Sequence, residues 1–278
     1  MFTSKFGSIL KRFNSKNLLL KVIRKFSCSS YFYLRSWITA QPEDLCKILK
    51  SDSVKQVLCV IAHPDDETFC SGLIVASINL GSEVSILCMT RGEGGDRETF
   101  TKEQIGAVRE VELRNAAEVL NVKNLWFMDY EDPEPQNSKL VAPEHDSNTL
   151  TRELAQKISQ SRADIVVTHG SIGEYYHPAH ILLNLHVRKA LKELGNDRIT
   201  LLTMNAWNPS HLMQNIINKY DYPSHQLDGS AFHDKRLQTL ECYRTQQRAF
   251  EKFCGGSLDR FIRLSAVERY CLVTTKGV

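Results

Sequence analysis

Two short motifs in this sequence pair a histidine with a second side chain that can bind a metal. In AHPDDE, His63 and Asp66 stand three residues apart directly after an apolar run. In HPAH, His177 and His180 have the same spacing at the start of a helix-like segment, so both project from one face. If the two motifs meet, two histidines and one carboxylate would hold a zinc ion with one position open, as in catalytic sites. The spacing therefore predicts a metal centre.

The side chains that do not bind the metal would supply the proton chemistry. A water molecule on such an ion becomes acidic near neutrality and gives a hydroxide nucleophile. Asp65 lies beside the expected ligand Asp66 and would accept the proton of that water. The histidine of HPAH that does not bind the metal would donate to a developing oxyanion. The competing interpretation is that Asp65 or Asp66 only caps a helix, a role worth about 1 kcal/mol.

Strand-like and helix-like segments alternate along the chain. Apolar runs typical of buried strands occupy residues 56–62, 83–90, 124–130, 163–170 and 200–207. Helical periodicity occupies residues 65–81, 102–122, 151–162 and 177–194, and a further helix near 232–250 precedes a strand over 268–275. This alternation predicts an α/β fold, a Rossmann-like three-layer sandwich with a mostly parallel central sheet.

The chemically rich stretches follow the predicted strands. HPDDE comes after the first strand, TRGEGGD after the second, DYEDPEP after the third and HGSIGEYYHPAH after the fourth. In open parallel sheets, binding sites form outside the carboxyl ends of the strands. We therefore expect the active site at this edge of the sheet, with the two histidine motifs meeting there.

The charge distribution separates a basic leader from the rest of the chain. Residues 1–42 contain eight Lys or Arg and no acid, whereas the whole chain carries +3, so residues 43–278 carry −5. We interpret residues 1–42 as a leader and 43–278 as one catalytic domain. The leader fits a solvated arm, an organelle-targeting peptide or an amphipathic helix on an anionic membrane surface.

Cysteine usage and hydropathy give the expected compartment. The eight cysteines form no C-x-x-C pair, which favours a reducing environment over a disulfide framework. No apolar run approaches the roughly 20 residues that span a bilayer. We expect a cytoplasmic protein; peripheral membrane contact or organelle targeting through the leader is the alternative.

Four segments together resemble one known family. AHPDDE, TRGEGG, VREVELRNAAEVL and GEYYHPAH are similar to motifs of the PIG-L/LmbE-like zinc-dependent N-deacetylases. The resemblance extends from about Val57 to Thr274 and includes RLQTLECYRTQQ and AVERYCLV. It implies a metal-dependent hydrolase that removes the acetyl group from an N-acetylglucosamine-type amino sugar conjugate by metal-activated water. The substrate would be a small molecule or a glycolipid.

The resemblance also implies a role for each motif residue. His63, Asp66 and His180 would bind Zn2+, with Fe2+ as the alternative metal. Asp65 would be the general base and would later protonate the leaving amine. His177 would stabilise the tetrahedral oxyanion.

Two arginines and one alanine complete the comparison with the family. Arg91 in TRGE or Arg109 in the R-x-x-E helix would bind substrate, although an ion pair of Arg109 with Glu112 or a neighbour fits the sequence equally well. The family often has Asp or Asn before the last histidine of its H-x-x-H motif, and this chain has Ala179. A carboxylate that would orient His177 is therefore missing at this position.

Three other classes of protein fit parts of the pattern. Non-haem iron oxygenases also use two histidines and a carboxylate, but they need no adjacent spare aspartate. An NAD-binding domain is disfavoured because RGEGGD does not supply G-x-G-x-x-G after the first strand. A non-enzymatic, membrane-associated binding protein would not need the intact ligand set. No nucleic-acid-binding module is recognisable, and the sequence does not address the oligomeric state.

Overall fold

The structure is a computed structural model that describes residues 41–51, 54–95, 99–207 and 213–273. Two parts of the predictions lie outside the described residues. They are residues 1–40 of the predicted leader and residues 274 and 275 at the end of the predicted last strand. Pro42–Val278 forms one compact unit. None of the described helices combines the length and apolar composition that crossing a bilayer requires.

The described domain is built on one mixed sheet of mostly parallel strands. The strands are β1 (Glu43–Asp44), β2 (Gln56–Ile61), β3 (Glu83–Cys88), β4 (Asn124–Phe127), β5 (Ile165–Thr168), β6 (Thr200–Thr203), β7 (His225–Asp228) and β8 (Val267–Val273). Their order is β1-β7-β8-β6-β5-β2-β3-β4. Only β8 runs antiparallel to its neighbours, β6 and β7. The predicted α/β fold is confirmed.

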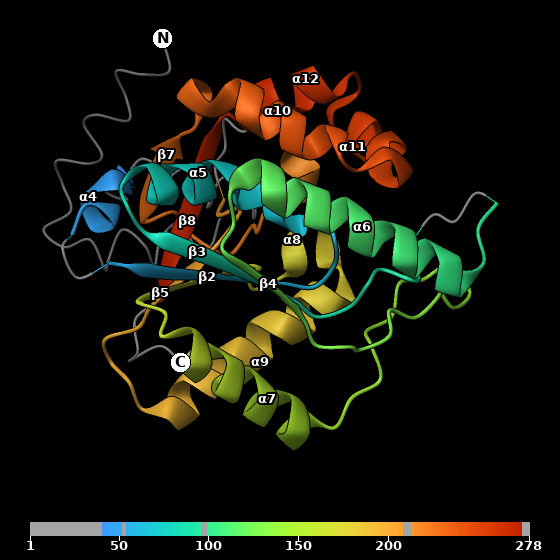
Figure 1. The fold of residues 1–278 in the computed structure, drawn as a ribbon, viewed down its shortest axis with the longest axis horizontal. Coiled ribbons are helices and arrows are strands. Elements are labelled where there is room, and N and C mark those ends of the chain that lie inside the picture. Colours follow the sequence, from blue (N-terminus) through green and yellow to red (C-terminus); the bar gives the residue numbers. More distant parts are fainter. Residues whose placement is uncertain (1–40, 52–53, 96–98, 208–212, 274–278) are drawn as a thin grey trace, which may run out of the picture. The chain divides into compact units, whose positions relative to one another are not determined.

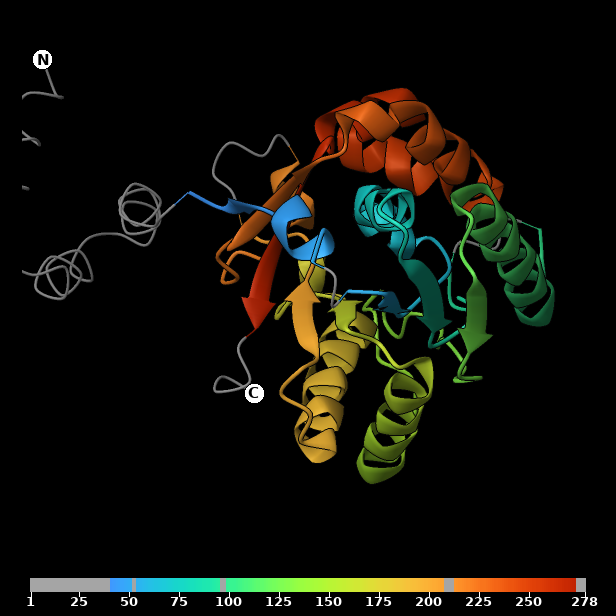
Figure 2. The same ribbon diagram turned by 60° about the vertical axis from the view of Figure 1, so that its left-hand side comes forward.

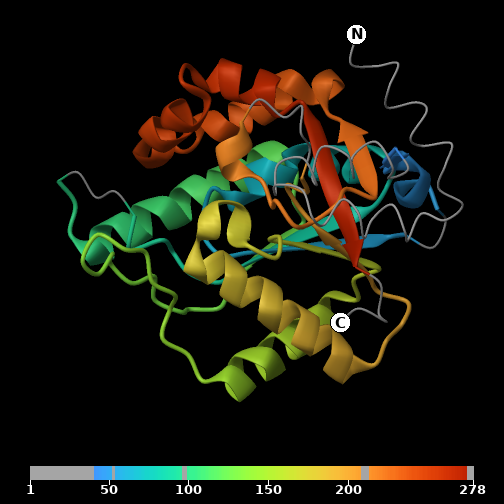
Figure 3. The ribbon, with the colours of Figure 1, turned by 180° about the vertical axis from the view of Figure 1, so that it is seen from behind.

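Helices cover both faces of the sheet. They are α4 (Cys46–Leu49), α5 (Ser71–Asn79), α6 (Lys102–Leu120), α7 (Ser147–Ser161), α8 (Gly173–Tyr176), α9 (Pro178–Leu194), α10 (His233–Glu241), α11 (Gln247–Cys254) and α12 (Leu258–Leu264). Helices α5, α6 and α10 to α12 lie on one side of the sheet, and α7 and α9 lie on the other (Figures 1 and 2). Seen from behind, α7 and α9 run next to each other (Figure 3), and they pack together.

The side chains of β2 explain why its sequence is a continuous apolar run. Cys59 and Ile61 belong to the core cluster beneath α5, α6 and α10 to α12. Leu58 and Val60 point the other way, into the cluster with α7 and α9. Successive side chains of a strand face opposite sides, and β2 lies between β5 and β3. Both of its faces are therefore buried.

Two predicted helices differ from the observed ones. The segment predicted as one helix over residues 65–81 begins with a 3-10 turn, Asp66–Cys70, before α5. The helix predicted near 232–250 is broken into α10 and α11 by a turn at Tyr243 (φ −91°, ψ 67°). This turn points the buried Tyr243 hydroxyl at Glu67, to which it donates a hydrogen bond (2.6 Å). Helical periodicity in the local sequence contains no sign of this long-range bond.

Candidate metal and acid–base site

The sheet order brings the two histidine motifs together. His63 follows β2, and HPAH follows β5 and the short helix α8. From β2 the chain continues to β3 and β4 on one side, whereas β5 and β6 lie on its other side. Loops at such a switch point diverge and leave a crevice. The motifs, more than 100 residues apart in the sequence, therefore meet at one edge of the sheet.

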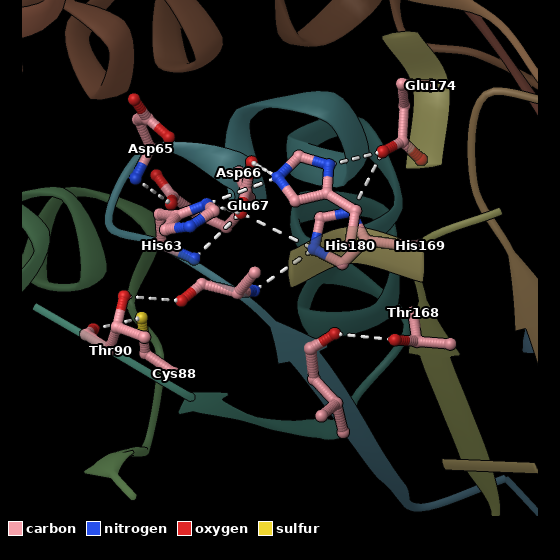
Figure 4. A network of polar contacts seen from close by, with 12 residues as sticks. His63, Asp65, Asp66, Glu67, Cys88, Thr90, Thr168, His169, Glu174 and His180 are labelled. Carbon is pink, nitrogen blue, oxygen red and sulfur yellow. Dashed lines mark hydrogen bonds and ion pairs between the residues drawn. The ribbon is translucent and has the colours of Figure 1, made fainter. Parts of the chain in front are cut away.

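The three predicted ligands form a compact cluster (Figure 4). His63 Nδ1 lies 3.2 Å from His180 Nε2 and 3.3 Å from Asp66 Oδ2, and His180 Nε2 lies 3.3 Å from Asp66 Oδ1. Ligands at about 2.0–2.1 Å from a tetrahedral zinc ion are themselves about 3.3–3.4 Å apart. The chemistry and the spacing of these donor atoms thus fit one zinc ion.

The electrostatics of the cluster favour a cation. Burial alone would lower the pKa of His63, but Asp132 and Asp66 raise it to about 10. Burial would raise the pKa of Asp66, but His180 and His169 hold it well below its usual value. His63 is therefore protonated in the metal-free protein, and a metal ion would displace its proton.

Asp65 lies next to the ligand cluster and has an unusual backbone. Its φ of 113° is in the left-handed region, which is rare for residues other than glycine, and its side chain makes no capping hydrogen bond. Asp65 Oδ2 lies 3.1 Å from Arg109 Nη2. Burial raises the pKa of Asp65 to about 7, although Arg109 opposes the shift. A carboxylate that titrates near neutrality suits a general base.

Arg109 is tied to the turns that follow β2 and β3. Its side chain, only 4% exposed, donates to the carbonyl oxygens of Gly92 (2.8 Å) and Pro64 (2.7 Å) as well as to Asp65. Gly92 has φ +70°, and a Cβ there would lie 2.2 Å from the guanidinium. Arg109 contacts the pocket, but these bonds direct it to Asp65 and the backbone, and its carboxylate partner is Asp65, not Glu112.

Arg91, the other predicted substrate-binding residue, points elsewhere. Its guanidinium pairs with Glu110 (2.5 Å) and Asp129 (2.6 Å) and lies over the ring of Phe127. Arg91 is not among the described residues that line the pocket. Its contacts link α6 to the end of β4.

His177 lies beside the cluster without a partner for one of its nitrogens. Its Nδ1 is buried and has no hydrogen-bond partner among the described residues. Burial, reinforced by His180 and His63, lowers the pKa of His177 far below its ordinary value. Ala179, fully buried, packs in the apolar cluster with Leu183. His177 is therefore neutral and has no carboxylate to hold it.

A pocket of about 130 Å³ opens over the cluster. Its polar floor includes His63, Asp65, Asp66, Arg109, Asp132 and His177. Its apolar walls come from the loop after β4, from α8 and from α11, through Leu140, Val141, Tyr175, Ala249, Phe250 and Phe253. The side chains thus surround a small space that is polar at the cluster of candidate ligands and apolar away from it.

Three residues of the site were missed by the sequence analysis. Asp132 Oδ1 lies 3.4 Å from His63 Nε2. His169 Nε2 accepts from the Ala62 amide (3.1 Å), so its Nδ1 carries the proton and donates to Glu174 (3.1 Å). Asp132 and Glu174 follow the ends of predicted strands and His169 lies near the end of one, but no spacing marked them.

The donor atoms also form two other groups, one of His63, His177 and His180 and one of Asp66, His169 and His180. Because both of its ring nitrogens already bond to the protein, His169 does not present a free ligand atom. The set His63, Asp66 and His180 is the better candidate for binding the ion.

The fold and the site define a class, an α/β protein with a two-histidine, one-carboxylate centre at the switch point of its sheet. Residues 58–191 match the family described as PIG-L: GlcNAc-PI de-N-acetylase. The resemblance to the PIG-L/LmbE-like family is thereby confirmed over residues 58–191, just under half of the chain.

Two curated relatives illustrate the similarity. The 1D-myo-inositol 2-acetamido-2-deoxy-alpha-D-glucopyranoside deacetylase of Corynebacterium glutamicum is 30% identical over 151 residues, 48% of this chain and 52% of the relative. The probable N-acetyl-alpha-D-glucosaminyl L-malate deacetylase 2 of Bacillus anthracis is 29% identical over 149 residues, 52% of this chain and 62% of the relative. The match thus spans about half the length of these relatives.

Solved structures share the fold. The N,N'-diacetylchitobiose deacetylase of Pyrococcus horikoshii has a TM-score of 0.57 at 18% identity, covering 84% of this chain and 91% of that one. The 4-carboxy-2-hydroxymuconate hydratase GalB of Pseudomonas putida has a TM-score of 0.58 at 19% identity, covering 79% and 96%. Since a deacetylase and a hydratase share this fold, the reaction must be argued from the site.

Proposed function

We propose that this protein is a metal-dependent deacetylase of an N-acetylglucosamine-type conjugate. The observation that carries the proposal is the cluster of His63, Asp66 and His180 with Asp65 beside it. The deacetylase names of the sequence relatives support the same reaction class.

Asp65 would transfer a proton twice during the reaction, first from water and then to the leaving nitrogen. A bound zinc ion would supply Lewis acidity and lower the pKa of water. Asp65 takes a proton from the water that attacks the acetyl carbonyl. The N–H of neutral His177 donates to the carbonyl oxygen as it gains negative charge. The C–N bond then breaks, Asp65 returns its proton to the departing nitrogen, and the products are the free amine and acetic acid, which loses its remaining proton to water and becomes acetate.

The pocket would hold only a small reacting group, and the rest of the substrate would lie outside it. The cavity of about 130 Å³ is small. It suits an acetamido group and part of a sugar ring, so the conjugated group lies toward the mouth. Leu140, which is 44% exposed and lines the pocket, is placed to contact that group.

The cellular setting is proposed from the sequence. A cytoplasmic enzyme whose basic leader contacts a membrane surface fits residues 1–42. Fractionation of the full chain and of a form lacking residues 1–42 tests this. Equal distribution of both forms between membrane and supernatant would contradict a role of the leader in membrane contact.

The function is tested by metal analysis combined with an amine-release assay. We expect about one zinc per chain and release of primary amine from N-acetylglucosaminyl substrates, both soluble and lipid-linked. His63→Ala should lose both the metal and the activity. Full zinc occupancy in that variant would refute the ligand assignment, and oxygen consumption by the iron-loaded protein would favour an oxygenase instead.

A further inference from the structure

Glu174 is a buried carboxylate that nothing so far assigns to the chemistry. Its Oε2 accepts hydrogen bonds from Nδ1 of His180 (2.6 Å) and from Nδ1 of His169 (3.1 Å). Its Oε1 accepts from the amide of Gly170 and the side chain of Asn218, both at 3.1 Å. Figure 4 shows the carboxylate facing both imidazoles from the side away from Asp66. Each of the two carboxylate oxygens of Glu174 therefore accepts two hydrogen bonds.

The backbone of Glu174 is held in a strained conformation. Its φ of 59° and ψ of −62° lie near those of the classic γ-turn, which is rare and strained. Such conformations persist only where the surroundings over-determine them, and they gather at functional sites. The strain indicates that the position of this carboxylate is enforced.

Asn218 supplies much of that enforcement from a distant part of the chain. Its Oδ1 accepts from the amide of Glu174 (3.0 Å), and its Nδ2 donates to Glu174 Oε1 and to the carbonyl of Met204 (2.9 Å). Asn218 is fully buried. A Cβ on Gly170 would lie 2.0 Å from the Asn218 side chain, so only glycine permits this approach.

We propose that Glu174, held in place by Asn218, is the positioning residue of the metal site and orients His180 through its Nδ1–H. This inference rests on the proposed metal centre. A histidine that binds a metal usually donates its other N–H to a carboxylate, which fixes the ring and strengthens the ligand. In this chain the carboxylate supports the ligand His180, whereas His177, next to Ala179, has none.

The test uses Glu174→Gln in the full chain and measures zinc affinity by competition with a chelator. An amide has one acceptor, so two of the four donors that meet Glu174 would lose their partner. We expect zinc affinity to fall about 10- to 100-fold. The absorption spectrum of the cobalt-substituted protein should also change, because it reports ligand geometry.

Glu268→Gln is the matched control. Glu268 is also a buried carboxylate with several partners, namely the amides of Gly72 and Leu73, the hydroxyl of Tyr270 and the guanidinium of Arg236. It touches none of the candidate metal ligands, so this variant should lower thermal stability without changing zinc affinity. Asn218→Ser is a second test, expected to weaken zinc binding while leaving the Glu174 carboxylate present.

The outcomes separate this inference from the proposed function. A folded Glu174→Gln variant with wild-type zinc affinity and cobalt spectrum would overturn the inference. If Glu174→Gln does not fold, wild-type affinity in Asn218→Ser would do so. Zinc binding that depends on Glu174 in a protein without deacetylase activity would leave the inference standing and refute the proposed reaction.

Discussion

Residues 58–191 and residues 192–273 contribute differently to the site. The first segment, which matches the family, contains all the candidate ligands and Asp65. The second contains none of them, but it supplies three buried side chains that hold the first in place, Asn218, Tyr243 and Glu268. The candidate chemical groups thus all lie in the segment that matches the family, and the side chains that position them come both from this segment, as Arg109 and Glu174 do, and from the second one.

The turn after β2 illustrates this dependence. Glu67 accepts from Tyr243 through Oε1 (2.6 Å) and from the amide of Asp65 through Oε2 (3.3 Å). Glu268 accepts from the amides of Gly72 and Leu73 at the start of α5. The strained backbone of Asp65 is therefore braced on its C-terminal side by contacts from the turn after α10 and from β8.

The largest expected effect comes from the first segment, with Asp65→Asn. Asparagine tolerates the left-handed backbone and keeps the shape, but it cannot accept the proton. We expect kcat to fall by about 10² to 10⁴ while zinc stays bound, measured by amine release and metal analysis of the same sample. Near-full activity would remove Asp65 from the role of general base.

Tyr243→Phe tests the bracing from the second segment. The change removes one hydroxyl and leaves Glu67 Oε1 buried without its donor, so we expect a loss of about 1–3 kcal/mol in the free energy of unfolding. Zinc affinity should be unchanged because no ligand contacts Tyr243. Denaturant unfolding and chelator competition measure the two quantities. An unaltered stability would show that the contact between the two segments contributes little.

The pH dependence of the stability of Glu67→Gln tests the same contact between the two segments. Burial raises the pKa of Glu67 from 4.5 to about 8, although the Tyr243 hydrogen bond opposes the shift. Between these values the folded state binds more protons than the unfolded state, so stability should fall as pH rises. Glu67 should lower the free energy of unfolding by up to about 1.4 kcal/mol for each unit by which the pH rises in this range, and Glu67→Gln should abolish that contribution. Denaturant unfolding of the metal-free proteins at pH 5, 6 and 7 measures it, and parallel profiles would contradict the assignment.

The smallest effect is expected for Arg91→Gln. Arg91 pairs with Glu110 and Asp129 away from the pocket, and partly exposed pairs of this kind contribute about 0–1 kcal/mol. We expect KM and kcat to stay close to those of the wild type. A large rise in KM would instead support the substrate-binding role predicted from the TRGE motif.

The sequence was sufficient to predict the parallel strands and the strand-end location of the site. Continuous apolar runs such as the one before His63 have that pattern because β2 is buried on both faces. By contrast, β7, with the sequence HQLD, and the two-residue strand β1 have no such run. They form because the neighbouring strands are already in place, and periodicity therefore does not predict them.

The site, like the sheet, was predictable from the sequence only in part. The amino-acid sequence by itself was sufficient to predict the candidate ligands and the candidate base, because the spacing within AHPDDE and HPAH fixes which side chains a turn or a helix start presents together. Only the tertiary structure decided that Arg109 holds Asp65, that Glu174 holds His180 and that Asn218 and Tyr243 hold the turns. The contacts of Arg109, Asn218 and Tyr243 join residues that are neighbours only after the sheet has formed, and the Glu174–His180 contact depends on the strained backbone of Glu174, so no local pattern encodes them.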